Sequence, residues 1–221
     1  MIERILPPEV CAVDTVDDAA DAVLFPEEEP EVARAVDRRR REFATARHCA
    51  RQALARLGLP ATAIPRGPKG EPCWPAGVVG SITHCAGYRA AVVARGSDLH
   101  TVGIDAEPHG PLPDGVLGAV SLPAERDMLA DLAATAPGTH WDRLLFCAKE
   151  SVYKAWFPLT RAWLGFEDAE VSVDADLGTF AARLLVSGPQ VGGARLTGFA
   201  GRWAVTDGVV LAAVALPVAP G

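Results

Sequence analysis

Residues 81–92 read SITHCAGYRAAV, and a related pattern returns at residues 203–214, which read WAVTDGVVLAAV. Each segment predicts a β-strand, a tight turn with a glycine, and a second strand that contains the motif Ala-Ala-Val. The glycines of the two turns are Gly87 and Gly208. A hairpin that occurs twice favours two related halves that meet near residue 103.

Each half also contains one long helical pattern. The first runs from about Glu31 to Leu57, where Gly58 and Pro60 follow, and the second runs from about Trp141 to Trp156. The apolar stripes are expected at Val36, Phe43, Ala50, Leu54 and Leu57, and at Trp141, Leu145, Ala148, Val152 and Ala155. Further strands are expected at residues 78–83, 89–95, 101–107, 169–173, 180–186, 195–206 and 209–216. The sequence therefore predicts an α+β fold in which each half is a long helix packed on a small antiparallel sheet.

The composition limits the class of protein. A length of 221 residues allows one or two domains, and 49% hydrophobic with 22% charged residues is typical of a globular chain. The net charge of −7 argues against a nucleic-acid binder. Five cysteines without a C-x-x-C pair predict reduced thiols, and no uncharged run has the length of a membrane span. We expect a cytoplasmic protein that binds neither nucleic acid nor membrane.

Lysine is rare, with three lysines against eighteen arginines. Lys69 lies in the loop PRGPKGEP at residues 65–72, and Lys149 and Lys154 flank Glu150 in the motif KESVYK. An ammonium group is a compact point charge that suits phosphate, whereas guanidinium is a planar fork. The placement predicts a phosphorylated substrate, with chance as the alternative.

Arginines add to the basic groups. Arg39, Arg40 and Arg47 lie on the first helix, and Arg47 falls within its apolar stripe. An arginine there must extend to solvent or meet an anion, and extension to solvent is favoured for the residue taken alone. The loop at residues 65–72 is either a phosphate-binding loop or a surface connector, and connectors are the more common case.

Three acids could hold a divalent cation. Asp105 and Glu107 leave the same face of one strand, and Glu150 can join them if its helix packs across that strand. Carboxylates together with substrate phosphates and waters are the ligands that Mg²⁺ prefers. The alternatives are a solvated strand end before Pro108 and an exposed pair between Glu150 and Lys154.

Ser81, His84 and Asp105 form a competing set that would suit a serine hydrolase. The sequence around Ser81 lacks the G-x-S-x-G pattern that marks a strained nucleophile turn, so this hypothesis is weak. A protein that binds a nucleotide or a carrier without catalysis is a third hypothesis.

Several segments together resemble a known family. They are residues 80–87 (GSITHCAG), 102–107 (VGIDAE), 146–154 (FCAKESVYK), 47–51 (RHCAR) and the loop at residues 67–72. In order and spacing they are similar to the signature segments of 4′-phosphopantetheinyl transferases of the Sfp-type, EntD-like group, and in particular to the actinobacterial PptT type. The resemblance covers most of the chain between about Arg38 and Phe166.

This resemblance implies an enzyme that moves the phosphopantetheine arm of coenzyme A onto a serine of an apo acyl or peptidyl carrier protein and releases 3′,5′-ADP. The implied fold is a pseudo-dimer of two α+β halves with the active site in the cleft between them. Residues 1–103 would contact coenzyme A, and residues 104–221 would supply the metal and catalytic residues. Carriers of fatty-acid, polyketide and nonribosomal-peptide synthesis are all compatible, and a monomer is expected.

The resemblance also implies roles for individual residues. Asp105, Glu107 and Glu150 would hold Mg²⁺, with Mn²⁺ as a substitute, and Glu150, Lys154 and Asp105 would be catalytic. The expected contacts with coenzyme A are Arg39, Arg47, Arg66, Gly67, Lys69, Gly70, Glu71, Thr83, His84, Asp105, Lys149 and Lys154. The base that accepts the serine proton is either Glu150 or a metal-bound water.

Two positions depart from the family pattern. Thr83 stands where the family usually has a second serine, which keeps a hydroxyl and adds a methyl group. Ala106 lies between the two strand acids and offers no further ligand, which leaves the coordination number of the metal open.

Overall fold

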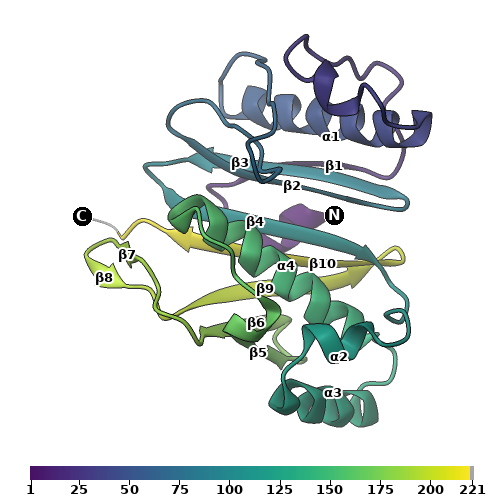
Figure 1. Ribbon diagram of the computed structural model, residues 1–221, viewed down its shortest axis with the longest axis vertical. Helices are drawn as coiled ribbons and strands as arrows, with labels where there is room; N and C mark the ends of the chain where they lie inside the picture. The colour runs from purple at the N-terminus through teal and green to yellow at the C-terminus, as the bar shows by residue number, and fades with distance from the viewer. Residues whose placement is uncertain (220–221) are drawn as a thin grey trace.

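The computed structural model describes residues 1–219 (Figure 1). Its α-helices are α1 (Asp37–Arg56), α2 (Val116–Val120), α3 (Pro123–Thr135) and α4 (Trp141–Thr160), and its short 3-10 helices are η1 (Ile2–Ile5), η2 (Glu29–Val32) and η3 (Phe166–Asp168). The strands are β1 (Cys11–Thr15), β2 (Val78–Cys85), β3 (Tyr88–Arg95), β4 (Leu99–Pro108), β5 (Ala169–Asp174), β6 (Thr179–Leu184), β7 (Gln190–Val191), β8 (Ala194–Arg195), β9 (Gly198–Thr206) and β10 (Val209–Pro217).

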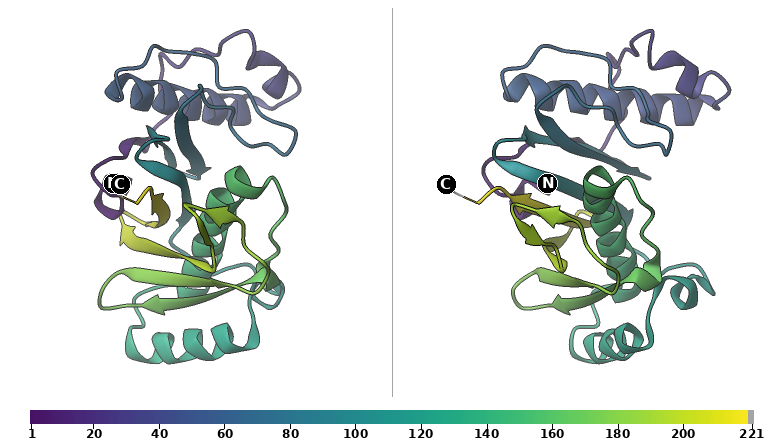
Figure 2. Two further views of the ribbon diagram at one scale, coloured as in Figure 1. Left: turned by 90° about the vertical axis from the view of Figure 1, so that its left-hand side faces the viewer. Right: turned by 60° about the vertical axis from the view of Figure 1, so that its left-hand side comes forward.

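The main strands form two antiparallel sheets. The first has the order β1-β3-β2, and the second has the order β4-β10-β9-β6-β5. Helix α1 packs on the first sheet and α4 packs across β4 and β10 of the second. The layers follow one another from α1 at one end of the long axis to α3 at the other (Figures 1 and 2). The predicted α+β pseudo-dimer is confirmed.

The two repeated segments are the two central hairpins. Cys85 pairs with Tyr88 across one two-residue turn, and Thr206 pairs with Val209 across the other. Gly87 and Gly208 have φ values of 76° and 75°, in the left-handed region that glycine adopts without a steric penalty. The sequence pattern thus predicted both turns correctly.

The Ala-Ala-Val motifs lie in strands that are buried on both faces. In β3, Ala91 and Val93 pack in the cluster beneath α1, while Ala90 and Val92 pack in a cluster shared with β4 and β10. In β10, alternate residues likewise face α4 and the first sheet. Successive side chains of a strand point to opposite faces, so a strand between two layers needs small apolar residues throughout.

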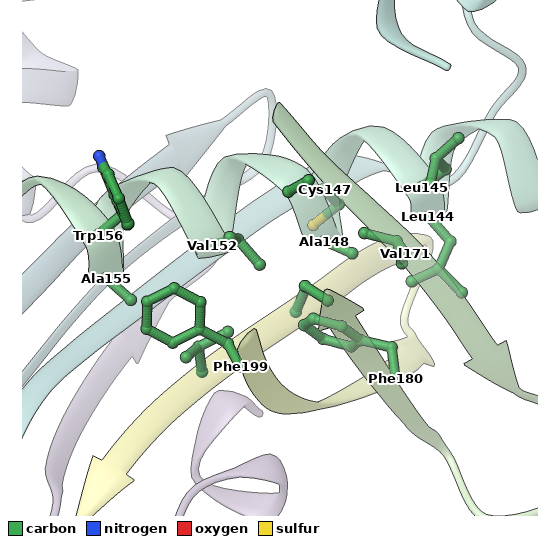
Figure 3. Packing of buried hydrophobic residues seen from close by; sticks show 14 of the residues in the cluster. Leu144, Leu145, Cys147, Ala148, Val152, Ala155, Trp156, Val171, Phe180 and Phe199 are labelled. Carbon is green, nitrogen blue, oxygen red and sulfur yellow. The ribbon is translucent and has the colours of Figure 1, made fainter. Parts of the chain in front are cut away.

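The predicted stripe of the second long helix is confirmed. Its five residues are all buried, and they belong to one cluster with Phe180 and Phe199 of the second sheet. Figure 3 shows the part of this cluster around Ala148 and Val152. At roughly 25 cal/mol per Å² of apolar surface removed from water, such a cluster is the dominant stabilising contribution of this half.

Two hydroxyl groups join the sheets where β2 lies beside β4. Ser81 Oγ accepts a hydrogen bond from the N–H of Ile104 at 3.1 Å, and Thr83 Oγ1 accepts one from the N–H of Ala106 at 3.1 Å. Strand β4 pairs with β10 along its other edge, so these hydroxyls satisfy N–H groups of an edge strand. The predicted half boundary, residue 103, falls inside β4.

Some predicted elements differ from those observed. The first long helix begins at Asp37 rather than near Glu31, because the chain turns through η2 and an extended Val36 before it enters α1. Val36 is therefore 73% exposed and is not part of the stripe. The strand β1 was missed, and the strand expected at residues 195–206 is divided between β8 and β9.

Two simpler expectations concern the cysteines and the membrane. All five cysteines are free thiols, of which Cys49 and Cys147 are buried and Cys73 is exposed. Among residues 1–219, no helix combines the length and apolar character needed to cross a membrane.

Gly103 is the point of closest approach between α4 and β4. A Cβ atom there would lie 2.1 Å from the carbonyl oxygen of Ser151 and 2.6 Å from the amide nitrogen of Ala155. We predict that Gly103→Ala lowers the free energy of unfolding by about 2–3 kcal/mol, since backbone atoms of a packed helix must move. Chemical denaturation measures the change. Gly118→Ala is the control, because nothing lies within 4 Å of a Cβ at that position. Equal stability of both variants would contradict the packing described here.

Candidate active site between the two halves

A cavity of about 530 Å³ lies between the two halves. The loop at residues 69–74 and β2 line it from the first half, and α4 lines it from the second. Its charged lining residues are Lys69, Glu71, Glu150, Lys154 and Arg161. The expected loop, strand and helix therefore meet around one cavity, large enough for a small-molecule substrate.

Asp105 is a buried acid beside this cavity, with 5% of its surface exposed. Its Oδ1 accepts hydrogen bonds from Lys154 Nζ at 2.7 Å and from Thr83 Oγ1 at 3.0 Å. Its Oδ2 is buried and, within residues 1–219, has no hydrogen-bond partner. The nearby thiol of Cys147 donates to the carbonyl of Val210 instead. Asp105 is thus not the solvated strand end considered as an alternative.

The other two acids lie near Asp105. Glu107 leaves the same face of β4 and accepts a hydrogen bond from Arg143 Nη1 of α4 at 2.9 Å. Burial, and then repulsion by Asp105, raises the pKa of Glu107 despite that arginine. Burial and repulsion by Asp105 also raise the pKa of Glu150. The charge of Asp105 therefore destabilises the charged forms of both glutamates.

The carboxylate groups of these three acids are ligands that suit a hard cation such as Mg²⁺. Across residues 1–219, no three His, Cys, Asp or Glu side chains lie close enough together to form a metal site as they stand. Asp105 and Glu107 are instead compensated by Lys154 and Arg143. An unpartnered buried carboxylate oxygen among mutually repelling acids is nevertheless the donor set that a divalent cation would stabilise.

Lys154 pairs with the strand acid rather than with Glu150 as an exposed helical pair. Burial lowers the pKa of Lys154, but attraction by Asp105 and Glu150 outweighs this effect and raises the pKa overall. The ammonium group thus stays charged, and it is attracted by two of the acids.

Arg47 does not extend to solvent, so the favoured interpretation of its position in the stripe was wrong. It is 4% exposed, and its Nε donates to the carbonyl of Ile64 at 2.9 Å. Its guanidinium lies 4.1 Å from the ring centroid of Phe43, and that of Arg66 lies 5.3 Å from the same ring. Burial, only partly offset by Glu28, lowers the pKa of Arg47 to about 10. Two cations held near one ring form a site that an anion would stabilise.

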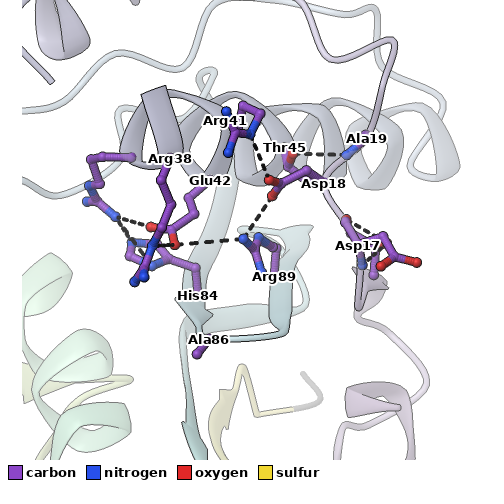
Figure 4. Close-up of polar contacts among 12 residues, drawn as sticks. Asp17, Asp18, Ala19, Arg38, Arg41, Glu42, Thr45, His84, Ala86 and Arg89 are labelled. Atoms are coloured by element: carbon purple, nitrogen blue, oxygen red, sulfur yellow. Dashed lines mark hydrogen bonds and ion pairs between the residues drawn. The ribbon is translucent and has the colours of Figure 1, made fainter. Parts of the chain in front are cut away.

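Arg39 and His84 form a second polar group near the end of β2. Figure 4 shows His84 with Glu42 and Arg89 beside it. Arg39 Nη1 donates to His84 Nε2 at 2.6 Å, which requires an unprotonated ring nitrogen. Burial and the charge of Arg39 lower the pKa of His84 to about 4. Glu42 holds Arg38 and Arg39 from α1, while Asp18 holds Arg41 and Arg89.

The loop at residues 65–72 is an ordered turn rather than an irregular connector. Arg66 and Pro72 form a bridge, and Gly67 N–H donates to the carbonyl of Glu71 at 2.7 Å. The carboxylate of Glu71 accepts hydrogen bonds from the N–H of Lys69 and from Arg161. It lies so close to Gly67 that a Cβ there would be 2.3 Å from it. Gly70 has a φ of 88°, and Lys69 beside it is exposed.

Lys149 is placed differently from the expectation that it contacts coenzyme A. Its Nζ lies 2.8 Å from Glu125 Oε2 and donates to the carbonyl of Phe166 at 2.7 Å. Both Lys149 and Glu125 are almost fully buried. The ammonium group therefore links α4 to α3 and η3. Lys149 was expected to contact coenzyme A, but in the structure its ammonium group is occupied by these contacts within the protein.

The hydrolase set is not assembled. Ser81 Oγ accepts the N–H of Ile104, His84 accepts from Arg39, and Asp105 is bonded by Thr83. Ser81 and His84 are three residues apart on one strand, so their side chains leave opposite faces. A nucleophile needs a base within hydrogen-bond reach, and this geometry does not provide one.

Two residues at the site were missed by the sequence interpretation. Arg143 pairs with Glu107, and its spacing of seven residues from Glu150 places both on one face of α4, a signal that could have revealed it. Arg161 ends α4 in the left-handed conformation and pairs with Glu71. Its position after the helix gave no comparable signal.

Comparison with known proteins now identifies the chain. Residues 27–94 match the family described as the 4′-phosphopantetheinyl transferase N-terminal domain, and residues 101–205 match the 4′-phosphopantetheinyl transferase superfamily. The chain is 58% identical over 224 residues to the 4′-phosphopantetheinyl transferase Svp of Streptomyces mobaraensis, which covers 100% of this chain and 91% of the relative.

Two further relatives agree. The 4′-phosphopantetheinyl transferase PptT of Mycobacterium tuberculosis is 57% identical over 87% of this chain and 86% of the relative. The 4′-phosphopantetheinyl transferase Npt of Nocardia iowensis is 52% identical over 97% of this chain and 99% of the relative.

The fold, the cavity between the two halves and these matches define a group-transfer enzyme. More specifically, the chain belongs to the 4′-phosphopantetheinyl transferase family and is similar to its actinobacterial members. It transfers the phosphopantetheine group of coenzyme A to carrier proteins. The resemblance inferred from the sequence motifs is confirmed.

The depressed pKa of His84 predicts how stability depends on pH. An unfolded histidine takes up a proton near pH 6.5, whereas the folded protein resists protonation of His84 until about pH 4. The free energy of unfolding should therefore decrease as the pH is lowered from about 6.5 to about 4. The decrease is at most about 1.4 kcal/mol per pH unit.

Chemical denaturation between pH 7 and pH 4.5 measures this slope. The variant His84→Gln keeps an acceptor for Arg39 but does not titrate. Its slope should be shallower by up to about 1.4 kcal/mol per pH unit, which corresponds to the uptake of one proton. Identical slopes in the two proteins would show that His84 is not held in its neutral form.

Proposed function

We propose that the cavity between the halves binds coenzyme A and that Asp105, Glu107 and Glu150 hold Mg²⁺ beside its pyrophosphate. The observation that carries this proposal is the buried, unpartnered Oδ2 of Asp105 among acids of raised pKa. Mg²⁺ favours carboxylates together with substrate phosphates, and Mn²⁺ would fit the same oxygen ligands. When bound, it would neutralise charge on the two phosphates.

The two halves divide the work in this proposal. Residues 1–103 bind the phosphates of coenzyme A through Arg39, His84, Arg47, Arg66 and Lys69, and residues 104–221 supply the acids and Lys154. The last two of these residues, 220 and 221, lie outside the described residues. The division is supported by the family matches, one of which ends at residue 94 while the other begins at residue 101.

The remaining members of the proposed binding set come from the loop at residues 65–72, from β2 and from α4. Gly67, Gly70 and Glu71 shape the ordered loop that presents Lys69, and Thr83 orients Asp105 through its hydroxyl. Lys149 takes a supporting place, because its ammonium group holds Glu125. It fixes the turn of α4 that carries Glu150.

In the proposed reaction, the serine oxygen of the carrier bonds to the phosphorus that carries the pantetheine arm. The bridging bond from that phosphorus to the other phosphate breaks, and 3′,5′-ADP leaves with the bonding electrons. Glu150 takes the serine proton, a role supported by its position in the wall of the cavity. Lys154, held on Asp105, lies where it can stabilise charge on the departing phosphate.

The natural carriers are proposed to be acyl or peptidyl carriers of fatty-acid, polyketide or nonribosomal-peptide synthesis. The duplicated halves already enclose a cleft, which supports a monomer as the active unit. Free cysteines, two of them buried, suit a reducing compartment such as the cytoplasm.

Removing one acid should abolish turnover without unfolding the protein. We predict that Asp105→Asn and Glu150→Gln each lower kcat by at least about 100-fold, since each loses a charge needed in the transition state. Mass spectrometry of apo carriers incubated with coenzyme A and Mg²⁺ measures the added phosphopantetheine. Asp176→Asn, at an exposed position, is the matched control. Near-normal rates in either site variant would refute these roles, and no mass gain across a panel of carriers would refute the transfer itself.

Metal binding can be measured without turnover. We predict that Mg²⁺ raises the melting temperature of the wild-type protein, because a bound cation relieves repulsion among the three acids. The rise should be much smaller in Asp105→Asn and unchanged in Asp176→Asn. Differential scanning calorimetry with and without a chelator measures the shift. An equal rise in all three proteins would place the cation elsewhere.

A further inference from the structure

The acidic segment PEEEP at residues 26–30 lies before α1 and holds one buried glutamate. Glu28 is 0% exposed, whereas its neighbour Glu27 is exposed to solvent. A carboxylate taken out of water is costly unless its oxygens are paired. The partners of Glu28 therefore reveal what it does.

Both oxygens of Glu28 are fully used. Arg51 Nη1 of α1 lies 2.9 Å from Oε1 and 3.0 Å from Oε2. The N–H of Phe25 donates to Oε2 at 3.0 Å, and the N–H of Ile64 donates to Oε1 at 2.8 Å. Arg51 also donates to the carbonyl of Val23 and lies 4.7 Å from the ring centroid of Phe25. Glu28 thus ties three separate segments together.

Ile64 passes this restraint to Arg47 and to the loop that carries Arg66 and Lys69. Its N–H is held by Glu28, and its carbonyl accepts the Nε of Arg47 at 2.9 Å. Pro65 follows it and closes the base of the loop by accepting the N–H of Cys73 at 2.9 Å. The loop that carries Arg66 and Lys69 therefore follows a residue, Ile64, whose backbone N–H and carbonyl are both held by hydrogen bonds.

We propose that Glu28 is a positioning residue for coenzyme A, because it fixes Ile64 and so sets the places of Arg47 and of the loop with Arg66 and Lys69. The inference rests on the proposed function, in which these cations contact the phosphates of coenzyme A. Glu28 touches no substrate and acts through Arg51 and Ile64.

The charges explain why a restraint is needed at this place. Arg51 and Arg66 both lie close enough to repel Arg47, and Glu28 is the foremost attraction that keeps Arg47 charged in its buried position. If Glu28 is neutralised, the three guanidinium groups can separate and the peptide of Ile64 can turn. Affinity for a polyanionic ligand depends on such preorganised cations.

The test compares Glu28→Gln with Glu27→Gln, which makes the same chemical change at the exposed neighbouring position. We expect Glu28→Gln to raise the KM for coenzyme A about tenfold, with kcat and the KM for the carrier within about twofold of wild type. The Kd of 3′,5′-ADP, measured by calorimetry, should rise by a similar factor. Glu27→Gln should leave all four quantities unchanged.

A stability control separates positioning from simple destabilisation. Tyr88→Phe removes a part-buried hydrogen bond to Asp14 at 2.8 Å, and Tyr88 packs in a cluster that includes no residue of the loop. It should lower the melting temperature without changing the KM for coenzyme A. Amide hydrogen exchange should increase at residues 64–73 in Glu28→Gln but not in Tyr88→Phe. If Glu28→Gln does not fold, Arg51→Lys, which keeps the charge but loses the fork geometry, should show the same KM effect at reduced size.

The inference is overturned if folded Glu28→Gln, or Arg51→Lys in its place, keeps the wild-type KM for coenzyme A and Kd for 3′,5′-ADP. Arg47→Ala distinguishes this result from a failure of the proposed function. If Arg47→Ala raises the KM and Glu28→Gln does not, only the positioning role of Glu28 is wrong. If Arg47→Ala leaves the KM unchanged, the proposed phosphate contact itself is wrong.

Discussion

The hydroxyl of Thr83 is the contact on which the site depends. It accepts the N–H of Ala106 and donates to Oδ1 of Asp105, so one group joins the two sheets and orients the buried acid. A hydroxyl can do both because it carries one donor hydrogen and two acceptor lone pairs. The family's usual serine would supply the same bonds. Thr83 is 3% exposed, so the additional methyl group of threonine is buried in the protein interior.

The short distance between α4 and β4 follows from a second constraint, the absence of a side chain at Gly103. Backbone atoms of Ser151 and Ala155 occupy the space that a Cβ would take, and Thr101 donates to the carbonyl of Ala155 at 2.9 Å. Only at this short distance can Lys154 reach Asp105 and Arg143 reach Glu107. The charged groups of the helix and strand are therefore placed by packing, and their attraction adds to a geometry that the backbone has already set.

The sequence predicted the elements and the residues of the candidate site better than it predicted their partners. Periodicity gave both central hairpins and the stripe of α4, since burial on one or both faces leaves a repeating pattern. It could not distinguish Lys149 from Lys154, because the choice depends on Glu125, which α3 brings from 24 residues away. Arg47 was misjudged for the same reason, since its partner is a backbone carbonyl at Ile64. β1 is a short edge strand beside β3, so its local pattern was weak.

Each half contains buried groups of like charge that repel one another, cations in the first half and acids in the second. In the first half, burial and the charges of Arg51 and Arg66 oppose the charge of Arg47, and in the second, Asp105 raises the pKa values of Glu107 and Glu150. Each problem is limited locally, by Glu28 on one side and by Lys154 and Arg143 on the other. A phosphorylated substrate would relieve the repulsion among the cations, and a divalent cation bound with it would relieve the repulsion among the acids. Because neither ligand suits both halves alone, the arrangement favours binding the two together. In the proposed function this would place the pyrophosphate between the charges that its transfer requires.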